Sequence, residues 1–433
     1  MSWQLAFCVY FGLLTIMIVF GLPIAAVMGF VGVAGITMLR GTMLWPSLAD
    51  VIWNTVNAFT LTAIPMFVLM GEIILRSGAA RRFYMGLAVL MNNVPGGLAQ
   101  SNIMACALFS AICGSSTATA LTIGTVALPE MRGRGYHDGI TLGTLTGGGA
   151  LGNLIPPSLF LLVYATVVQQ SAIDLFVATI IPGVIAVLMF MIYVAYRAIR
   201  DPSLVPEKAP RYSWTEFFRG LWQVTPMAGL IGAIIASMYF GIVTPTEAAA
   251  FGCLLALILA LFYREMTRRE LWTALINSIA VSCVMSIIVI NGQILGFAIV
   301  QAGIGRGVAD ALAQAHLAPF LFFTLLFALY LFLGSALDGL AMMLLTVPAL
   351  YPTLRAMGYN DIWFGVFLVI QVELAQLSPP IGLNLLAVQS IARDVDMKTI
   401  TYASLPYAVM LSALCFLLYF FPGIALWLPA TMK

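Results

Sequence analysis

Long apolar runs that hold almost no charged residue dominate this sequence. Only 8% of the 433 residues are charged and 62% are hydrophobic, whereas about 25% of the residues in a soluble domain carry a charge. No soluble core needs this much apolar surface, so the excess is expected to face lipid. At roughly 20 residues per span plus loops, there is room for about a dozen membrane elements. We therefore predict an all-α polytopic membrane protein.

The first apolar run, from Leu5 to Phe20, is not preceded by any Lys or Arg. A secretory signal would begin with a basic segment. We therefore predict that this run is the first transmembrane helix and that it is retained.

Two halves of the chain carry the same motifs in the same order. The pairs are GEIILRSG (71–78) with GFAIVQAG (296–303), LIPP (154–157) with LSPP (377–380), Gly135-Tyr136 with Gly358-Tyr359, TVALPEMRGRGY (125–136) with TVPALYPTLRAMGY (346–359), and FGLPIAA (20–26) with FGIVTPTEAAA (240–250). The first three pairs are offset by 225, 223 and 223 positions. Such regularity indicates an internal duplication, with halves of roughly 200 residues. A polar linker, Arg197 to Arg219, joins the two halves.

The basic residues predict that the two halves have opposite orientations in the membrane. The linker and the cluster at 264–269 are rich in Arg and Lys, so we place both in the cytoplasm. With both termini in the periplasm, 15 of the 19 basic residues lie inside. The four exceptions are Arg40, Arg306, Arg355 and Lys433. The opposite orientation would invert this ratio, so we predict inverted-topology repeats in a bacterial inner membrane.

One segment in each half is expected to enter and leave the membrane on the same side. The segment 95–132 is apolar but is interrupted by GSSTAT from Gly114, and basic residues flank it, Arg81 and Arg82 upstream and Arg132 and Arg134 downstream. The matching segment 319–355 is interrupted at 334–338 (GSALD). We predict a re-entrant helical hairpin in each half, with its tip at the interruption.

The span that follows each hairpin is expected to be broken. The segment 139–170 contains GGGALGNLIPPS, and 361–392 contains QLSPPIGLN. Proline removes a backbone donor and glycine permits unwinding. Unwound backbone at membrane depth is tolerated where it lines a cavity.

Paired tips and paired breaks in inverted halves predict a binding site near the middle of the membrane. Half-helix N-termini attract anions, and unwound carbonyls suit a small hard cation such as Na⁺. The first candidate set is Ser115, Ser116, Thr117, Thr119, Gly148, Gly149, Asn153, Pro156 and Ser158. The second is Gly334, Ser335, Asp338, Ser378, Gly382 and Asn384.

Structural roles compete with each of these assignments. Serine and threonine hydroxyls bond readily to their own helix or glue helices together. Asp338 could N-cap the second hairpin arm instead of facing a cation. Glu373 also lies in an apolar span, and an internal hydrogen bond would account for it. Glu72, His137 and His316 are expected to be structural, as are the six cysteines, which form no CxxC pair.

Absent motifs narrow the functional class. The sequence has no GxxxxGK[ST] and no HExxH, and its two histidines cannot support a catalytic set. An intramembrane enzyme is a remote alternative. No basic run interleaved with aromatics suggests nucleic-acid binding. No Arg or Lys falls in the predicted core, so an organic anion would rely on helix N-termini, polar side chains and bound Na⁺.

GSSTATALTIGTVALPEMRGRGY, GGGALGNLIPPS and QLSPPIGLN closely resemble the large membrane subunit of TRAP (tripartite ATP-independent periplasmic) transporters. The resemblance extends over essentially the whole chain. It implies an Na⁺-coupled secondary carrier for carboxylates and no further cofactor. It also implies two partners: a small membrane subunit of four helices, expected as a separate polypeptide, and a periplasmic substrate-binding protein.

The resemblance also implies an elevator mechanism, in which a transport domain slides against a scaffold. The scaffold parts would be 1–95 and 223–318, the transport parts 96–196 and 319–433, and the cytoplasmic linker 197–222. The implied sodium ligands are Ser116, Thr117, Gly149 and Asn153 in one site, and Ser335, Asp338, Ser378 and Gly382 in the other. The second tip has fewer hydroxyls than the first. A similar pattern occurs in single-component divalent anion/sodium symporters, which are the alternative.

Overall fold

The computed structural model describes residues 2–206 and 212–432, and within these ranges the chain is all-α. Lys208 and Arg211 of the predicted linker, and Lys433, lie outside the described residues. Nine helical segments of the described chain are long and apolar enough to cross a membrane. The prediction of an all-α polytopic membrane protein is confirmed.

The first half contains ten α-helices and the second half another ten, all within the described residues. The first ten are α1 (Trp3–Val19), α2 (Ile24–Arg40), α3 (Trp45–Val56), α4 (Ala63–Arg76), α5 (Ala79–Leu90), α6 (Leu98–Cys113), α7 (Ser116–Gly133), α8 (Asp138–Gly149), α9 (Leu159–Val168) and α10 (Ala172–Arg200). The others are α11 (Trp214–Tyr239), α12 (Pro245–Tyr263), α13 (Arg268–Gln301), α14 (Ile304–Gln314), α15 (Pro319–Ala336), α16 (Gly339–Ala356), α17 (Asp361–Gln376), α18 (Leu383–Ile391), α19 (Met397–Phe420) and α20 (Gly423–Ala430). Short 3₁₀ turns are η1 (Gly41–Leu44), η2 (Phe59–Thr62) and η3 (Pro202–Leu204).

The order of elements confirms the duplication. Helices α6 to α10 match α15 to α19, with the two hairpins and the two broken spans in the predicted places. Gly78 and Gly303 occupy equivalent positions before α5 and α14, with φ of 72° and 69°. This left-handed conformation is one that glycine adopts without steric cost.

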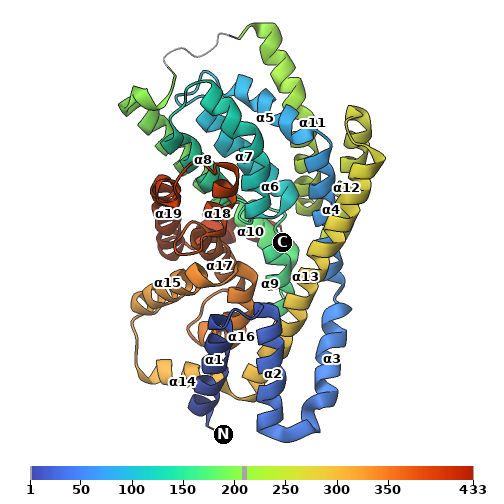
Figure 1. Ribbon diagram of the computed structural model, residues 1–433. Coiled ribbons are helices and arrows are strands. Elements are labelled where there is room, and N and C mark those ends of the chain that lie inside the picture. Colours follow the sequence, from blue (N-terminus) through green and yellow to red (C-terminus); the bar gives the residue numbers. More distant parts are fainter. Residues whose placement is uncertain (1, 207–211, 433) are drawn as a thin grey trace.

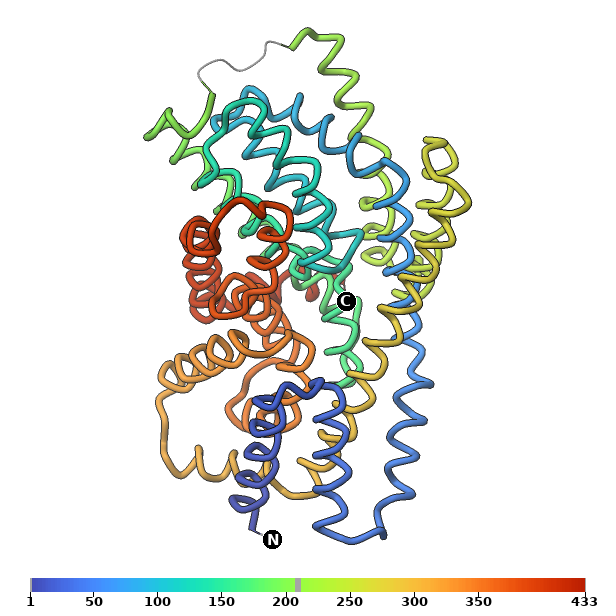
Figure 2. Tube along the Cα trace, in the orientation of Figure 1, coloured from blue at the N-terminus to red at the C-terminus, as the bar shows by residue number. Residues whose placement is uncertain are grey.

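The halves are inverted relative to one another. In Figure 1, α1 begins and α4 ends at opposite ends of the molecule, whereas α11 begins at the end where α4 finishes and α13 runs from that end to the other. The chain around the linker and the α12–α13 turn lie at one end, whereas the N-terminus, η1 and α14 lie at the other (Figures 1 and 2). The segments predicted to be cytoplasmic are therefore grouped at one end. Which membrane face this end occupies stays a prediction.

Reciprocal contacts join the two outer parts. Helix α2 packs on α13, and its counterpart α12 packs on α4. A glycine marks each contact: a Cβ on Gly32 would lie 2.8 Å from Ile294, and one on Gly252 would lie 2.7 Å from Met70. Small residues let membrane helices approach closely in this way. The repeats are thus held together by equivalent surfaces.

Hairpin and broken-helix elements interlock across the repeats. Hairpin α6–α7 packs on α8, and α18 of the second repeat packs on both α7 and α8. Helix α9 of the first repeat contacts α16 and α17 of the second. The two tips consequently meet near the centre of the molecule (Figure 1).

The linker is shorter than the predicted range 197–222. Helix α10 continues to Arg200, and α11 begins at Trp214. Ser213 and Glu216 form a capping box, which satisfies the first backbone donors of α11 and fixes its start inside the polar segment. The polar composition of the helix ends made the linker look longer than it is.

Equivalent ion pairs fasten the base of each hairpin to the next helix. Arg132 at the end of α7 binds Asp138 at the start of α8 with two bonds of 2.8 and 2.9 Å. Arg355 and Asp361, both 223 positions later, pair at 2.6 Å. Arg132 also reaches Asp394 of the other repeat at 3.0 Å. Each hairpin base is therefore tied to the element that follows it.

Replacing Asp394 with Asn tests the contact between repeats. The hydrogen bond from Arg132 holds the pKa of Asp394 below its usual range. The pair therefore stabilises the folded chain above the unfolded pKa of about 3.9, and this contribution is lost as the pH falls through the lower folded pKa. We expect Asp394→Asn to melt slightly below wild type at neutral pH in detergent, with a difference that shrinks below about pH 4.

Asp396→Asn is the matched control, because Asp396 lies in the same loop and its side chain makes no capping bond. Equal losses in the two variants would contradict a specific role for Asp394.

Candidate functional site

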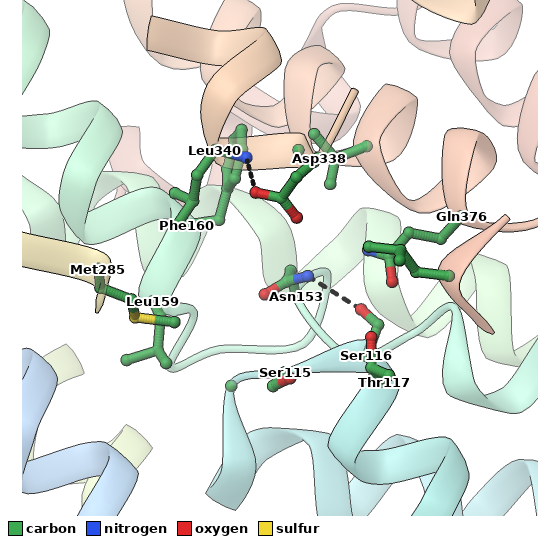
Figure 3. A pocket seen from close by; sticks show the side chains of 14 residues that line it. Ser115, Ser116, Thr117, Asn153, Leu159, Phe160, Met285, Asp338, Leu340 and Gln376 are labelled. Atoms are coloured by element: carbon green, nitrogen blue, oxygen red, sulfur yellow. Dashed lines mark hydrogen bonds between the residues drawn. The ribbon is translucent and has the colours of Figure 1, made fainter. Parts of the chain in front are cut away.

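A cavity of about 90 Å³ lies where both hairpin tips meet both helix breaks (Figure 3). Helix α13 contributes Met285 to its wall. The lining residues are Gly114, Ser115, Ser116, Thr117, Asn153, Leu159, Phe160, Met285, Asp338, Gly339, Leu340, Val372, Gln376 and Leu383. Of these, Asp338 is the one ionisable side chain.

The first tip is built by a glycine and two serines. Gly114 ends α6 in the left-handed conformation (φ 56°), which reverses the chain. Ser115 then N-caps α7, with its Oγ accepting from the backbone N–H of Ala118 at 3.5 Å. The α7 N-terminus therefore faces the cavity with a neutral cap, and its partial positive charge is retained.

The second tip is also followed by a side-chain N-cap, but its N-cap residue is charged. Asp338 is the repeat equivalent of Ser115 and N-caps α16, accepting from the N–H of Leu340 at 3.1 Å. The capping role considered for Asp338 is thus confirmed. Its carboxylate is also exposed to the cavity and faces Asn153 (Figure 3). The cap and the cavity-facing group are the same side chain.

The first break is enclosed by protein. Helix α8 ends at Gly149, and α9 begins at Leu159 after Ser158, whose Oγ accepts from the N–H of Leu161 at 3.4 Å. A Cβ on Gly152 would overlap the backbone of Ser116. The tip and the break of the first repeat are therefore in direct backbone contact.

The second break is shorter and more open. Helix α17 ends at Gln376, and α18 begins after Gly382, whose φ is 50°. Pro379 and Pro380 are exposed, whereas Pro156 and Pro157 are buried. Both Pro-Pro bonds are cis.

Glu373 joins the two repeats beside the cavity. It is 0% exposed on α17, and its Oε1 accepts from the backbone N–H of Asn153 at 2.7 Å and from Nδ2 of Asn153 at 2.8 Å. The hydroxyl of Ser116 lies 2.6 and 2.8 Å from its two carboxylate oxygens. Nδ2 of Asn153 also donates to Ser116 Oγ at 2.9 Å. The internal hydrogen bond considered for Glu373 is confirmed, and its partners are two predicted sodium ligands.

The structure gathers only part of the candidate set. Ser115, Ser116, Thr117, Asn153 and Asp338 line the cavity. The other candidates lie outside its lining and mostly have local structural roles. These are Thr119, Gly148, Gly149, Pro156, Ser158, Gly334, Ser335, Ser378, Gly382 and Asn384.

Three of the hydroxyls outside the lining bond to their own helices. Thr119 donates to Ser115 O at 2.8 Å, Ser335 to Phe332 O at 2.7 Å, and Ser378 to Leu374 O at 2.9 Å. Of the second predicted sodium set, Asp338 alone therefore reaches the cavity. The separate second sodium site stays a prediction.

Three of the remaining candidates are glycines in close contact with neighbouring side chains. Gly148 lies against Cys106, Gly149 against Ala120, and Gly334 against Ala375. Pro156 lines a separate cavity of about 330 Å³ whose wall side chains are all apolar. Asn384 is fully buried, and neither polar atom of its side chain has a partner among the described residues.

Two polar residues near the cavity were outside the candidate set. Gln376 precedes the second Pro-Pro pair by three residues, as Asn153 precedes the first, so alignment of LIPP with LSPP could have found it. Glu373 bonds to residues more than 200 positions away, and no local motif signals such a contact.

The profile described as "Tripartite ATP-independent periplasmic transporter, DctM component" matches residues 11–424. The chain belongs to the DctM family of TRAP transporter large permease subunits. The expected family is thereby confirmed, and its members are permease subunits, not enzymes.

Curated members of the family are similar along their whole length. The chain is 30% identical to the C4-dicarboxylate TRAP transporter large permease protein DctM of Rhodobacter capsulatus, covering 97% of this chain and 98% of that protein. It is also 30% identical to the sialic acid TRAP transporter large permease protein SiaM of Vibrio cholerae, covering 94% and 95%. The ectoine/5-hydroxyectoine large permease protein UehC of Ruegeria pomeroyi is 29% identical, with 93% and 92% covered.

Solved transporters share the fold at low sequence identity. The YdaH transporter of Alcanivorax borkumensis superimposes with a TM-score of 0.61 at 13% identity, covering 88% of this DctM-family chain and 89% of that chain. MtrF of Neisseria gonorrhoeae gives a TM-score of 0.51 at 14% identity, covering 89% and 84%. These matches concern the fold alone.

Gly152→Ala tests the contact between the first tip and the first break. The added methyl group would overlap the Ser116 backbone, which cannot move without displacing α7. We expect a lower melting temperature and loss of transport. Gly133→Ala in α7 is the control, because a Cβ there meets nothing within 4 Å. Wild-type transport by Gly152→Ala would contradict the close contact.

Proposed function

We propose that this chain is the large permease subunit of an Na⁺-coupled secondary importer for an organic acid. The observation that carries the proposal is the composition of the central cavity. Both repeats contribute oxygen acceptors to its lining, and the second repeat also contributes the carboxylate of Asp338. None of its described lining residues is basic. An organic anion would need a bound cation there.

The chemistry of the lining supports sodium as that cation. Hydroxyl, amide and carboxylate oxygens are ligands for hard cations, and unwound backbone beside them offers further carbonyls. Asp338 faces Asn153 across the cavity (Figure 3). A single Na⁺ between these two groups would offset the Asp338 charge before an anion enters.

The two helix N-termini at the cavity differ in charge. Ser115 leaves the partial positive charge of the α7 terminus available, whereas the carboxylate of Asp338 offsets that of α16. We therefore place a substrate carboxylate beside the α7 terminus and sodium beside Asp338. Both positions lie within one cavity.

The size of the cavity implies a rearrangement on binding. Small-molecule sites are typically about 300–1,000 Å³, and this cavity is about 90 Å³. It has room for an ion with a few waters, and a substrate could enter only after the tips separate. The larger apolar cavity beside Pro156 lacks polar groups for an acid.

An elevator movement would carry this site across the membrane. The hairpins and broken helices of the two repeats interlock with each other, and the outer helices α2, α4, α12 and α13 pack among themselves. Such a division suits a transport domain that slides on a scaffold. We place the scaffold and its partners in the bacterial inner membrane, with both termini of this chain in the periplasm.

The family description and the names of relatives support the two partners. A tripartite system requires two further components, and we propose a small four-helix membrane subunit and a periplasmic substrate-binding protein. Relatives are named for C4-dicarboxylates, sialic acid, ectoine and isethionate. Because these names span several chemical classes, the binding protein is proposed to select the substrate. The family membership favours this arrangement over a single-component symporter.

The function is tested by uptake into proteoliposomes that contain the chain with its small subunit. Labelled C4-dicarboxylates, sialic acid and ectoine would be supplied with the cognate binding protein, and Na⁺ would be replaced by choline. We expect uptake of one class to require Na⁺. Undiminished uptake in choline would refute sodium coupling, and uptake without the binding protein would favour the single-component alternative.

Asp338→Asn and Ser116→Ala test the proposed sodium position. Asp338→Asn removes the cavity charge, and Ser116→Ala removes one of the two hydrogen-bond acceptors of the Asn153 side-chain NH₂ group. We expect each to raise the Na⁺ concentration for half-maximal uptake by on the order of tenfold. Thr125→Ala is the control, because the Thr125 hydroxyl of α7 donates to its own helix at Thr122 O. Wild-type sodium titrations in both variants would contradict the assignment.

A further inference from the structure

Glu373 is a buried carboxylate that touches neutral donors only. Its partners are the Ser116 hydroxyl and the backbone and side-chain N–H groups of Asn153. A backbone N–H can only donate, so Oε1 of Glu373 is an acceptor, and it accepts from Nδ2 of Asn153 as well. The orientation of the Asn153 side-chain amide is therefore fixed by Glu373.

Both hydrogens of the Asn153 side-chain amide are used in hydrogen bonds. Its Nδ2 donates to Glu373 Oε1 at 2.8 Å and to Ser116 Oγ at 2.9 Å. An amide nitrogen carries two hydrogens, so both are used. The amide oxygen must lie at the opposite end, and Figure 3 shows it on the side of Asn153 that is turned away from Ser116.

Shape alone does not choose which end of the amide faces the cavity. The oxygen and the NH₂ group of an asparagine side chain are nearly equal in size, and hydrogen-bond partners decide between them. Without an acceptor at Glu373, the NH₂ group could turn toward the carboxylate of Asp338 and bind it directly. The cavity would then present a donor where a cation needs an acceptor.

We propose that Glu373 is a positioning residue that turns the Asn153 amide oxygen into the cavity and thereby creates a cation ligand there. The proposal rests on the proposed function, because it assigns how the sodium position is built. Glu373 itself does not line the cavity. It acts through Asn153 and Ser116.

The two repeats differ at the position of Glu373. Glu373 lies six residues before Pro379, and the position six residues before Pro156 is Ala150. An alanine cannot orient Gln376, the repeat equivalent of Asn153. The proposal therefore predicts one oriented amide ligand in the cavity, contributed by the first repeat.

Sodium binding can be measured without knowing the substrate. The purified full-length chain in detergent is melted at increasing NaCl, with choline chloride holding total chloride constant. A ligand that binds the folded state raises the melting temperature, and the concentration dependence reports its affinity. We expect the wild-type midpoint to rise with Na⁺. Glu373→Met removes the acceptor at similar side-chain size, and for this variant the same rise should need on the order of tenfold more Na⁺.

A double variant separates orientation from general disruption. In Asn153→Asp both ends of the side chain are acceptors, so an oxygen faces the cavity whichever way it turns. We expect Glu373→Met/Asn153→Asp to return the Na⁺ dependence close to wild type. Gln371→Met is the control on the same helix, because Gln371 is equally buried and its amide oxygen has no partner among the described residues.

The outcomes distinguish the two proposals. A lower melting temperature of Glu373→Met with an unchanged Na⁺ dependence would assign Glu373 a purely structural role and overturn the inference. So would a double variant that needs as much Na⁺ as Glu373→Met. If the wild-type chain shows no Na⁺-dependent rise at all, the sodium position of the proposed function fails instead.

Discussion

Backbone groups at membrane depth need hydrogen-bond partners, and the centre of this structure depends on how two broken helices meet that need. Each unpaired group in hydrocarbon costs several kcal/mol, so irregular backbone persists only inside protein or beside a polar cavity. In the first repeat the break is enclosed: Asn153 N–H donates to Glu373, and Gly152 lies against Ser116. Tip and break therefore stabilise each other. Neither the tip nor the break continues as a helix, and the cavity between the repeats lies where these helices end.

The two helix N-termini at the cavity lie close together but differ in charge. Ser115 and Asp338 occupy equivalent capping positions, yet one cap is neutral and the other is charged. The duplication thus supplies matching backbone geometry, and single side chains give the two tips different charges. The Arg132–Asp138 and Arg355–Asp361 pairs keep the hairpin bases alike.

Much of this arrangement could be predicted from the sequence because its signals are local. Glycine and proline marked the tips and breaks, and the basic residues marked the inverted orientation. The hydrogen-bond partners of individual side chains could not be predicted in the same way. Ser335 and Ser378 have the expected residue type but bond to their own helices, and a rotamer cannot be read from a sequence. Glu373 meets Ser116 through tertiary packing alone, so its partners became visible only in three dimensions.

The absence of a carboxylate at Ala150 has an evolutionary consequence. Copies that began with the same sequence had the same residue at both positions. The present chain has an alanine at 150 and a glutamate at 373. The two copies have therefore diverged at this position since the duplication, and the electrostatic asymmetry beside the cavity arose after the duplication that produced the two repeats.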